Sequence, residues 1–318
     1  MLPKILIISA QEDPHVHSVT RHLDQKGVPW SLVDLRKLSQ ESLTLDMDKC
    51  KFWFGEVEIS EYNSVWYRRA WPTLIEELTG EYLEWAREEF KQAFLGALLS
   101  LNAHWVSYPI AIKKASYKPL QLYLARSKFG LNIPQTLITS NPKQAREFVE
   151  HFGLKNCIAK CLGAPFIKEG ELTINQTIFT NRLDNITLSD LEDLKLAPCI
   201  FQTFIEKQFE VRLNVVGEQV LAAKIYSSEV SEAAIDWRTV DHTRLRHEPI
   251  VVPKQIESAC IGLCKELGLR FGALDFIVDP HGEWYFLEIN ANGQWQWVED
   301  VTGLPISKAL ADELSSHH

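Results

Sequence analysis

The sequence has no segment apolar enough to cross a membrane. Its longest apolar run, Ala93–Leu101, is much shorter than the roughly 20 residues that a membrane-spanning helix needs. The first residues, Met1–Ser9, contain no signal-peptide core and no small-residue cleavage site, and they read as a buried strand instead. We therefore expect a cytoplasmic protein without a membrane partner.

Cysteine pairs with metal-binding spacing are missing as well. The six cysteines stand far apart or four residues apart, and none forms a Cys-x-x-Cys pair: Cys50, Cys157, Cys161, Cys199, Cys260 and Cys264. This spacing argues against a zinc site. It favours free, buried thiols in a reducing compartment.

An excess of basic residues is also absent. The chain holds 33 Lys and Arg against 42 Asp and Glu, which gives a formal net charge of −9. A protein that binds nucleic acid without regard to sequence normally carries a basic stripe, so we expect no nucleic-acid partner. A local basic site, for example for a triphosphate, remains compatible with this charge.

Several catalytic signatures cannot be found in the chain. There is no Gly-x-Ser-x-Gly elbow, no Walker A loop and no His-Glu-x-x-His motif, so the chemistry of those classes is not expected. The chain is rich in tryptophan, with ten residues. Because Trp often lines pockets and interfaces, we expect some of them at a binding surface.

Alternating strand and helix patterns predict an α/β (α+β) chain. The β-branched run Lys4–Ser9 is followed by a helix pattern over Val16–Lys26, and a longer helix pattern covers Glu76–Leu101. With 318 residues, the chain is long enough for more than one core. We predict an N-terminal α/β domain at 1–111, a central subdomain at 112–198 and a C-terminal subdomain at 199–318.

Two pairs of strands are predicted from their patterns. Cys157–Leu162 and Leu172–Phe179 read as paired strands of the central part. Phe271–Val278 and Glu283–Asn290 read as a hairpin, because Asp279–Gly282 between them is a strong turn signal.

This hairpin carries the most informative polar residues. Asp275 lies on its first strand, and Glu288 and Asn290 stand two residues apart on the second strand, so they face the same side. Two carboxylates and an amide among apolar neighbours are costly to bury without a cation, and hard oxygen ligands suit Mg²⁺. The alternative is an acidic hairpin that faces solvent.

The hairpin resembles the metal-binding core of the ATP-grasp superfamily, in which Mg²⁺ and ATP lie between two α+β subdomains. The resemblance implies an ATP-grasp fold behind an N-terminal pre-ATP-grasp domain. Two upstream lysines resemble the phosphate-contacting lysines of that family. Lys118 opens a helix pattern over Ser116–Phe129, and Lys160 ends an otherwise apolar strand. The alternative for each lysine is a solvated surface charge.

The same resemblance assigns the remaining nucleotide contacts. Gln202, Thr203, Phe204 and Ile205 resemble the hinge strand whose backbone reads adenine, and Glu210 resembles the acid that accepts hydrogen bonds from the ribose hydroxyls.

Two arginines complete the predicted site. Arg212 resembles the arginine that faces the phosphates and the substrate carboxylate; alternatively it forms a surface ion pair with Glu210. Arg238 lies in a polar loop whose position resembles a loop that contributes to the active site in relatives. The segment Cys161–Gly170, with only two glycines, departs from the Gly-rich flap of many relatives.

A closer resemblance, to the microviridin-type ATP-grasp ligases or graspetide synthetases, covers nearly the whole chain. It rests on Ser64–Arg69, Lys118–Leu122, Pro134–Thr139, Phe271–Phe276, Leu287–Trp295 and Thr302–Ile306. The resemblance implies that a side-chain carboxylate of a ribosomal precursor peptide is phosphorylated by ATP. A Ser or Thr hydroxyl or a Lys amine then forms an ω-ester or ω-amide. It also implies two Mg²⁺ ions, with Mn²⁺ as an alternative, and a peptide partner made of leader and core.

The resemblance also suggests where the leader peptide binds, whereas the number of subunits stays open. The resemblance points to a short acidic helix with Asp190, Glu192 and Asp193 and to strands around Ile167–Phe179. Monomer and homodimer both stay open. Two other functions also stay open: a ligase that adds an amino acid to a peptide or protein C-terminus, and a non-catalytic nucleotide-dependent peptide-binding module. No role is assigned to His317 and His318, which resemble the remnant of a tag.

Overall fold

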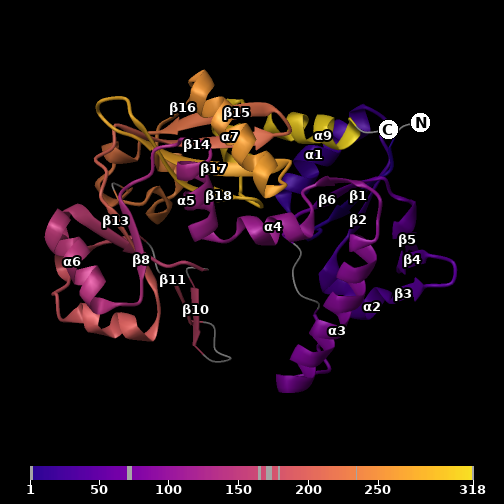
Figure 1. Cartoon of the computed structure of the whole chain (residues 1–318). Coiled ribbons are helices and arrows are strands. Elements are labelled where there is room, and N and C mark those ends of the chain that lie inside the picture. Colours follow the sequence, from indigo (N-terminus) through magenta and orange to yellow (C-terminus); the bar gives the residue numbers. More distant parts are fainter. Residues whose placement is uncertain are drawn as a thin grey trace.

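A computed structural model describes residues 3–69, 74–163, 166–169, 174–177, 180–233 and 235–316. For 166–169, 174–177 and 185 it describes the backbone alone. A five-stranded sheet and its helices span one side of the molecule. The N-terminal parallel sheet and the central antiparallel sheet lie at its two ends (Figure 1).

The N-terminal part is a parallel sheet with helices and a small hairpin sheet. The parallel sheet has the order β2-β1-β6-β7 and contains β1 (Ile5–Ile8), β2 (Trp30–Val33), β6 (Ser64–Tyr67) and β7 (His104–Val106). The second sheet contains β3 (Leu43–Asp46), β4 (Lys51–Phe54) and β5 (Val57–Glu58). The helices are α1 (Pro14–Gln25), α2 (Leu38–Glu41) and α3 (Gly80–Leu99).

The predicted strand and helices of this part are confirmed with shifted ends. The run at Lys4–Ser9 forms β1, which is completely buried, as expected for a parallel strand covered on both faces. Helix α1 begins after Asp13, whose side chain accepts a hydrogen bond from the amide of His15.

The central part is an antiparallel sheet in the order β12-β9-β13-β8, covered by a helix. Its elements are β8 (Thr136–Thr139), α6 (Pro142–Phe152), β9 (Cys157–Lys160), β12 (Asn181–Arg182) and β13 (Cys199–Thr203). Asn141 caps α6 by accepting from the amides of Lys143 and Gln144. A 3₁₀ helix, η5 (Asp190–Leu196), replaces the short α-helix expected near the acidic residues.

The predicted pairing of Cys157–Leu162 with Leu172–Phe179 is wrong. Strand β9 pairs with β12 and β13 instead. A separate hairpin joins β10 (Phe166–Glu169) to β11 (Ile174–Thr177). The apolar patterns of the two segments predict strands but carry no information about partners, which are chosen by packing against α6 and β13.

Strand β13 is informative about the subdomain limits. It pairs with β8 and β9 of the central sheet, although the predicted boundary at residue 198 places it with the C-terminal part. Helices α4 (Pro109–Ala115) and α5 (Lys118–Ser127) follow the N-terminal sheet. Ser116 and Tyr117 separate them, so the helix expected over Ser116–Phe129 begins at Lys118. The subdomain limits themselves stay a prediction.

The C-terminal part is an antiparallel sheet in the order β16-β15-β14-β17-β18. Its strands are β14 (Phe209–Val216), β15 (Gln219–Ile225), β16 (His247–Pro249), β17 (Phe271–Val278) and β18 (Trp284–Asn290). The helices are α7 (Lys254–Leu267), α8 (Gln296–Thr302) and α9 (Ile306–Ser315). The predicted hairpin of β17 and β18 is confirmed, and Gly282 supplies the left-handed residue of its turn, with φ of 87°.

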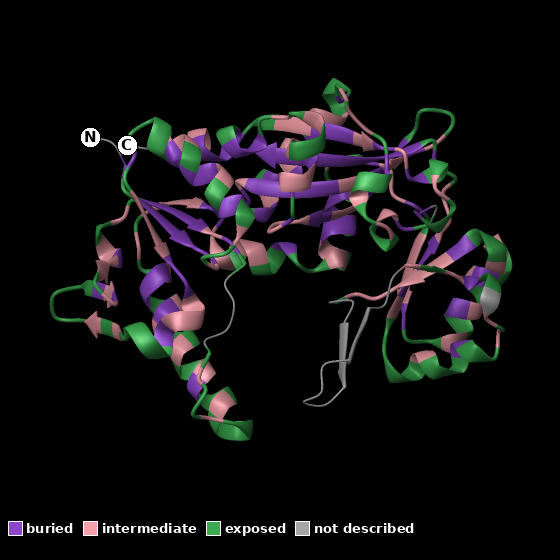
Figure 2. Ribbon diagram, turned by 180° about the vertical axis from the view of Figure 1, so that it is seen from behind, coloured by how far each residue is buried: buried purple, intermediate pink, exposed green. Residues whose placement is uncertain are grey.

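Buried side chains join the two ends of the chain into one core (Figure 2). Ile5 and Ile7 of β1 share a hydrophobic cluster with Leu310 and Leu314 of α9. The hydroxyl of Ser64 in β6 donates to the carbonyl of Leu314 at 2.8 Å. The N-terminal sheet is therefore fixed against the sheet that carries the predicted metal ligands.

Other expectations concern membranes and cysteines. Within the described part of the chain, no helix combines the length and apolarity that crossing a membrane requires. All six cysteines are free, and Cys157, Cys260 and Cys264 are buried as predicted. Cys50 is exposed, so the expectation of buried thiols is wrong for this residue.

Candidate active site

The predicted site residues meet in one cavity of about 960 Å³ between the central and C-terminal sheets. All twelve of them line it: Lys118, Lys160, Gln202, Thr203, Phe204, Ile205, Glu210, Arg212, Arg238, Asp275, Glu288 and Asn290. They come from α5, five strands (β9, β13, β14, β17 and β18), the hinge that follows β13 and the loop before β16. The structure therefore brings all the residues predicted for the site to one cavity. The role of each residue in that cavity stays a prediction.

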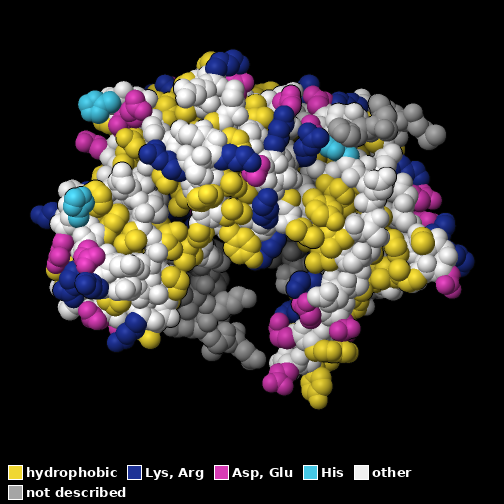
Figure 3. Space-filling view, viewed as in Figure 1, with side chains coloured by type: hydrophobic (Ala, Val, Ile, Leu, Met, Phe, Trp, Pro, Cys, Tyr) yellow, Lys and Arg dark blue, Asp and Glu magenta, His cyan; other side chains and the backbone are white. Residues whose placement is uncertain are grey.

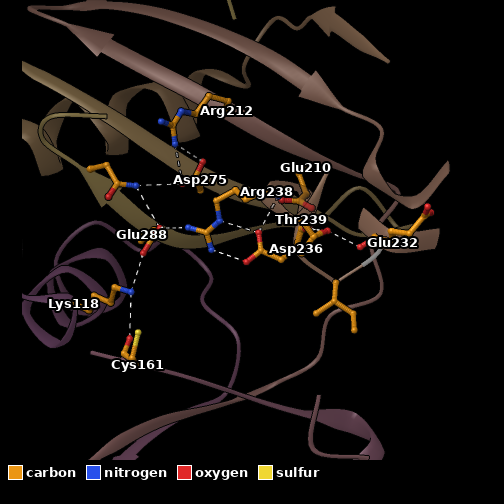
Figure 4. Close-up of polar contacts among 12 residues, drawn as sticks. Lys118, Cys161, Glu210, Arg212, Glu232, Asp236, Arg238, Thr239, Asp275 and Glu288 are labelled. Carbon is orange, nitrogen blue, oxygen red and sulfur yellow. Dashed lines mark hydrogen bonds and ion pairs between the residues drawn. The ribbon is translucent and has the colours of Figure 1, made fainter. Parts of the chain in front are cut away.

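Two of the three predicted metal ligands, Asp275 and Glu288, lie close together on the hairpin (Figure 4), and Asn290 follows two residues after Glu288 on β18. Asp275 of β17 faces Glu288 of β18 in the register, at a bulge between Asp275 and Phe276. The amide nitrogen of Asn290 lies 3.4 Å from Asp275 Oδ2 and 3.4 Å from Glu288 Oε1. The bulge and the two-residue spacing thus aim all three side chains at one point of the cavity.

Arg212 forms an ion pair with the carboxylate of Asp275. It pairs with Asp275 across β14 and β17 and donates to both carboxylate oxygens, at 2.8 and 3.0 Å. A second guanidinium nitrogen donates to the carbonyl of Gln294 at 2.8 Å. The alternative of an ion pair between Arg212 and Glu210 is not the arrangement found, because both residues have other partners.

Three cations surround Glu288. Lys118 Nζ lies 3.3 Å from Glu288 Oε2, and Arg238 Nη1 lies 3.8 Å from Glu288 Oε1. Burial raises the pKa of Glu288, but Lys118, Lys160 and Arg238 together outweigh this effect and lower it to about 2. Burial conversely lowers the pKa of Lys160 to about 8, although Glu288 favours its charged form.

The pKa of Asp275 shifts in the opposite direction to that of Glu288. Burial raises its pKa, with Glu288 adding to the effect and Arg212 opposing it. Two neighbouring carboxylates with opposite pKa shifts, in a cavity lined by cations, are typical of functional sites.

The hinge after β13 offers backbone and side-chain groups to the cavity. The amide of Thr203 donates to the carbonyl of Gln135, and the amide of Phe204 donates to the carbonyl of Asn156. Among the described residues, no acceptor bonds the amide of Ile205. The side chain of Gln202 is completely buried, and its Oε1 has no donor in the described part of the chain.

Two residues that were not predicted from the sequence, Lys207 and Ser227, contact the carboxylate of Glu210. Lys207 Nζ forms a buried ion pair with Glu210 Oε1, and the hydroxyl of Ser227 donates to the same oxygen at 2.7 Å. Burial nevertheless raises the pKa of Glu210. Lys207 is three residues before Glu210 in the connection between β13 and β14, a spacing that resembles that of an ordinary surface pair.

The loop before β16 brings Arg238 to the cavity. Asp236, which is buried, accepts from the backbone amide and from two guanidinium nitrogens of Arg238. The indole rings of Trp237 and Trp297 are tilted by 42° with their centroids 4.9 Å apart, and both line the cavity together with His242. Two of the ten tryptophans therefore line this cavity, and their place at a binding surface stays a prediction.

Other predicted features lie partly outside the described residues. Asp190 accepts from the amide and hydroxyl of Thr187, and Glu192 forms an ion pair with Arg146. Around Ile167–Phe179, the structure describes only 166–169 and 174–177, and of these only the backbone. In the segment Cys161–Gly170, at the position of the flap, residues 164, 165 and 170 lie outside the described residues. His317 and His318 also lie outside the described residues.

The donor set fits Mg²⁺ held together with a nucleotide. Among the described residues, no group of three or more His, Cys, Asp or Glu could hold a metal ion. The site has only two carboxylates and one amide, so an ion here needs phosphate and water oxygens to complete its shell, as Mg²⁺ commonly does. The unbonded Oε1 of Gln202 likewise fits a donor such as the amino group of adenine.

Comparison with known proteins supports an ATP-grasp fold for this part of the chain. Residues 114–314 match the RimK-like ATP-grasp domain. Among curated protein sequences, none matches this chain.

Solved structures resemble the chain over almost its whole length. A RiPP-associated ATP-grasp ligase from Chryseobacterium gregarium, in complex with ADP and a leader and core peptide, is 30% identical with a TM-score of 0.88, covering 99% of this chain and 97% of that one. The macrocyclase MdnC from Microcystis aeruginosa MRC, bound to precursor peptide MdnA, is 28% identical with a TM-score of 0.86, covering 99% and 100%. The macrocyclase MdnB from the same organism is 30% identical with a TM-score of 0.78, covering 98% and 99%.

Proposed function

Since this chain belongs to the RimK-like ATP-grasp family of ATP-dependent, ADP-forming ligases, we propose that it macrocyclises a ribosomal precursor peptide. In this reaction an Asp or Glu side chain of the core becomes joined to a Ser or Thr hydroxyl as an ω-ester, or to a Lys amine as an ω-amide. The observation that carries the proposal is the convergence of all twelve predicted site residues on one cavity in which cations surround two carboxylates.

The first step is phosphoryl transfer. A carboxylate oxygen of the peptide attacks the γ-phosphorus of ATP, the bond to the β–γ bridging oxygen breaks, and ADP leaves with that oxygen. Negative charge passes between phosphate and carboxylate oxygens, so stabilising it requires positioned cations rather than a nucleophile. Lys118 and Lys160 suit the triphosphate as point charges, and the fork of Arg212 suits the acyl phosphate.

The second step is acyl transfer within the peptide. The acceptor oxygen or nitrogen attacks the carbonyl carbon of the acyl phosphate, the bond from that carbon to the phosphate oxygen breaks, and the acceptor's proton leaves with inorganic phosphate. Arg238, half-exposed and anchored by Asp236, suits stabilisation of the departing phosphate.

The hinge and the strand after it hold the nucleoside. The Ile205 amide and Gln202 Oε1 provide a donor and an acceptor for the adenine edge, together with the backbone of Thr203 and Phe204. Glu210 accepts from the ribose hydroxyls. Its raised pKa is compatible with this role, because Lys207 and Ser227 still favour the ionised carboxylate.

Asp275, Glu288 and Asn290 hold Mg²⁺ in this proposal. Two ions are proposed, with Mn²⁺ able to replace Mg²⁺, since two carboxylates can each contribute oxygens to two neighbouring ions. Bound Mg²⁺ would neutralise charge on the β- and γ-phosphates. The three residues themselves orient the ions by their fixed positions on the hairpin.

The peptide is proposed to bind through its leader at the central part. Figure 3 shows acidic and basic side chains interspersed over the visible face. The acidic residues Asp190, Glu192 and Asp193 of η5 could attract a basic leader, and the neighbouring hairpin β10–β11 offers backbone for strand addition. We further propose that the enzyme works in the cytoplasm and has no nucleic-acid partner; monomer and homodimer both stay open.

The test uses a candidate precursor: a short peptide rich in Thr, Ser, Asp and Glu, to be sought among the open reading frames beside the gene. The enzyme is incubated with this peptide, ATP and Mg²⁺, and the products are analysed by mass spectrometry and by ADP release. Each ring formed should remove one water mass from the peptide, and ADP should appear only when peptide is present.

The alternatives predict different results. A ligase for a peptide or protein C-terminus would need a free amino acid and would increase the mass. A non-catalytic module would bind nucleotide and release no ADP. ADP release without peptide dependence would contradict the macrocyclase proposal.

A further inference from the structure

Three polar side chains of the N-terminal part are buried where that part meets the C-terminal sheet. Asp13, His15 and Arg68 come from the start of α1 and the end of β6, and none of them is among the residues that line the cavity. Arg68 is only 1% exposed. Burying a charged group so completely is costly unless it has specific partners.

These partners connect the N-terminal part to the loop after β18. Arg68 Nε donates to Asp13 Oδ2 at 2.9 Å, and Arg68 Nη1 donates to the carbonyl of Gly293 at 3.3 Å. The amide of Trp295 donates to His15 Nε2 at 3.3 Å, and the two rings meet edge to face at 4.9 Å. Two residues of the loop are thus held by side chains from more than 200 positions earlier in the chain.

The residue between them bonds to the active site. The carbonyl of Gln294 accepts from Arg212 Nη2 at 2.8 Å. The loop lies tightly against the site, because a Cβ atom at Gly293 would be 2.5 Å from the Cβ of Ala273 and 2.9 Å from Arg212 Nη2. Three consecutive loop residues therefore link Arg68, Arg212 and His15.

The hydrogen bonds define the protonation of His15. The Trp295 amide can only donate, so His15 Nε2 must accept, and the proton of the neutral ring sits on Nδ1. That nitrogen lies 2.8 Å from Asp13 Oδ1 and donates to it. Burial lowers the pKa of His15 and Arg68 adds to the effect, while Asp13 opposes both.

We propose that His15 and Arg68 are positioning residues for Arg212. By fixing the loop Gly293–Trp295, they hold the Gln294 carbonyl against the guanidinium and so keep Arg212 in place beside Asp275 at the wall of the cavity. The inference rests on the proposed function, in which Arg212 stabilises the acyl phosphate. Neither positioning residue lines the cavity.

Protonation of His15 should release the loop. A proton on Nε2 would place two N–H donors opposite each other, so the bond to Trp295 would be lost. The charged groups that face the ring are Asp13 at the start of α1, and Arg68 and Arg69 after β6. Acid should therefore slow phosphoryl transfer more than it weakens ATP binding.

Two substitutions at one position separate loop positioning from a structural role. In His15→Gln the side-chain amide oxygen can replace Nε2 as acceptor for Trp295. In His15→Asn the shorter amide can replace only Nδ1 and still donate to Asp13. The matched control is His17→Gln, on the same helix and exposed.

The readouts are peptide-dependent ADP release as a function of pH and hydrogen exchange of a peptide fragment spanning 291–297. His15→Asn should lower kcat about fivefold, which corresponds to one lost hydrogen bond. The KM for ATP should stay within about twofold, because the nucleotide contacts are elsewhere. His15→Gln should keep kcat within about twofold and lose the decline of kcat in acid, since its amide does not titrate.

Hydrogen exchange keeps this inference separate from the proposed function. Fragment 291–297 should exchange faster in His15→Asn than in wild type, His15→Gln or His17→Gln, whether or not the peptide is a substrate. Equal exchange in all four proteins would overturn the inference, as would equal loss of kcat in both His15 variants. If the wild-type enzyme forms no rings while the exchange pattern holds, only the proposed function fails.

Discussion

Replacing Glu288 with Gln gives the most direct test of the site. The substitution keeps the size of the side chain but removes one proposed metal ligand and the anion that faces Lys118, Lys160 and Arg238. We expect ADP formation to fall at least about 100-fold, a loss typical of a removed charge-stabilising group. The protein should remain folded.

The stability change can be worked out from the charges around Glu288. Its pKa is about 2 rather than the ordinary 4.5. Each pKa unit corresponds to about 1.4 kcal/mol, so the ionised form stabilises the fold by roughly 3 kcal/mol relative to the protonated form. Because the pKa is lowered by folding, this stabilisation is present above about pH 4.5 and is lost as the pH falls toward 2.

Gln resembles the protonated carboxyl, so Glu288→Gln should cost roughly 3 kcal/mol at neutral pH. This is less than the total stability of a typical domain, about 5–15 kcal/mol. The difference from wild type should shrink in acid. Urea denaturation at neutral and acidic pH measures it, and a coupled assay measures ADP release.

The control is Glu283→Gln, which makes the same change at an exposed position of the same hairpin. It should leave both activity and stability close to wild type. Wild-type turnover in Glu288→Gln would refute the assignment of this residue. A stability loss that stays constant down to the lowest pH would refute the electrostatic reasoning.

Three further changes test other parts of the site. Gly293→Ala would place a Cβ 2.5 Å from that of Ala273, so we expect a loss of about 1–3 kcal/mol in urea denaturation together with weaker ADP release. The control Gly96→Ala, on an exposed turn of α3 with no atom within 4 Å, should instead stabilise by about 0.5–1 kcal/mol. The pKa of Lys160 is about 8, below its ordinary 10.5, so kcat/KM for ATP should fall as the pH rises through about 8. This decline should disappear in Lys160→Arg, whose guanidinium stays charged, and its persistence there would exclude Lys160 as the cause. Glu210→Gln should raise the KM for ATP more than it lowers kcat, and an unchanged KM would argue against a ribose contact.

Much of the site could be predicted because its signals are local. The turn at Asp279–Gly282 and the apolar strands beside it predict the hairpin. The two-residue spacing of Glu288 and Asn290 places both on one face whatever the rest of the chain does. The resemblance to a known family then predicted the upstream residues, including Lys118 and Lys160. The structure places these residues in the same cavity as the hairpin.

The pairing of strands in the central part could not be predicted in the same way. The pattern of Cys157–Leu162 predicts a strand but is equally compatible with several partners. Its actual partners, β12 and β13, are fixed by how α6 and η5 cover the sheet. Register and partner choice depend on such packing and not on local preference.

By itself, then, the sequence determined which residues form strands and turns and which side chains share a face, because these properties depend on near neighbours in the chain. Only the tertiary structure decided that Ser227 bonds to Glu210, that Arg212 forms an ion pair with Asp275, and that His15 accepts from the amide of Trp295 across 280 positions. Such contacts arise when distant segments pack into one core. Their energy comes from burial and from charges brought within a few ångströms, which the linear order of residues does not specify.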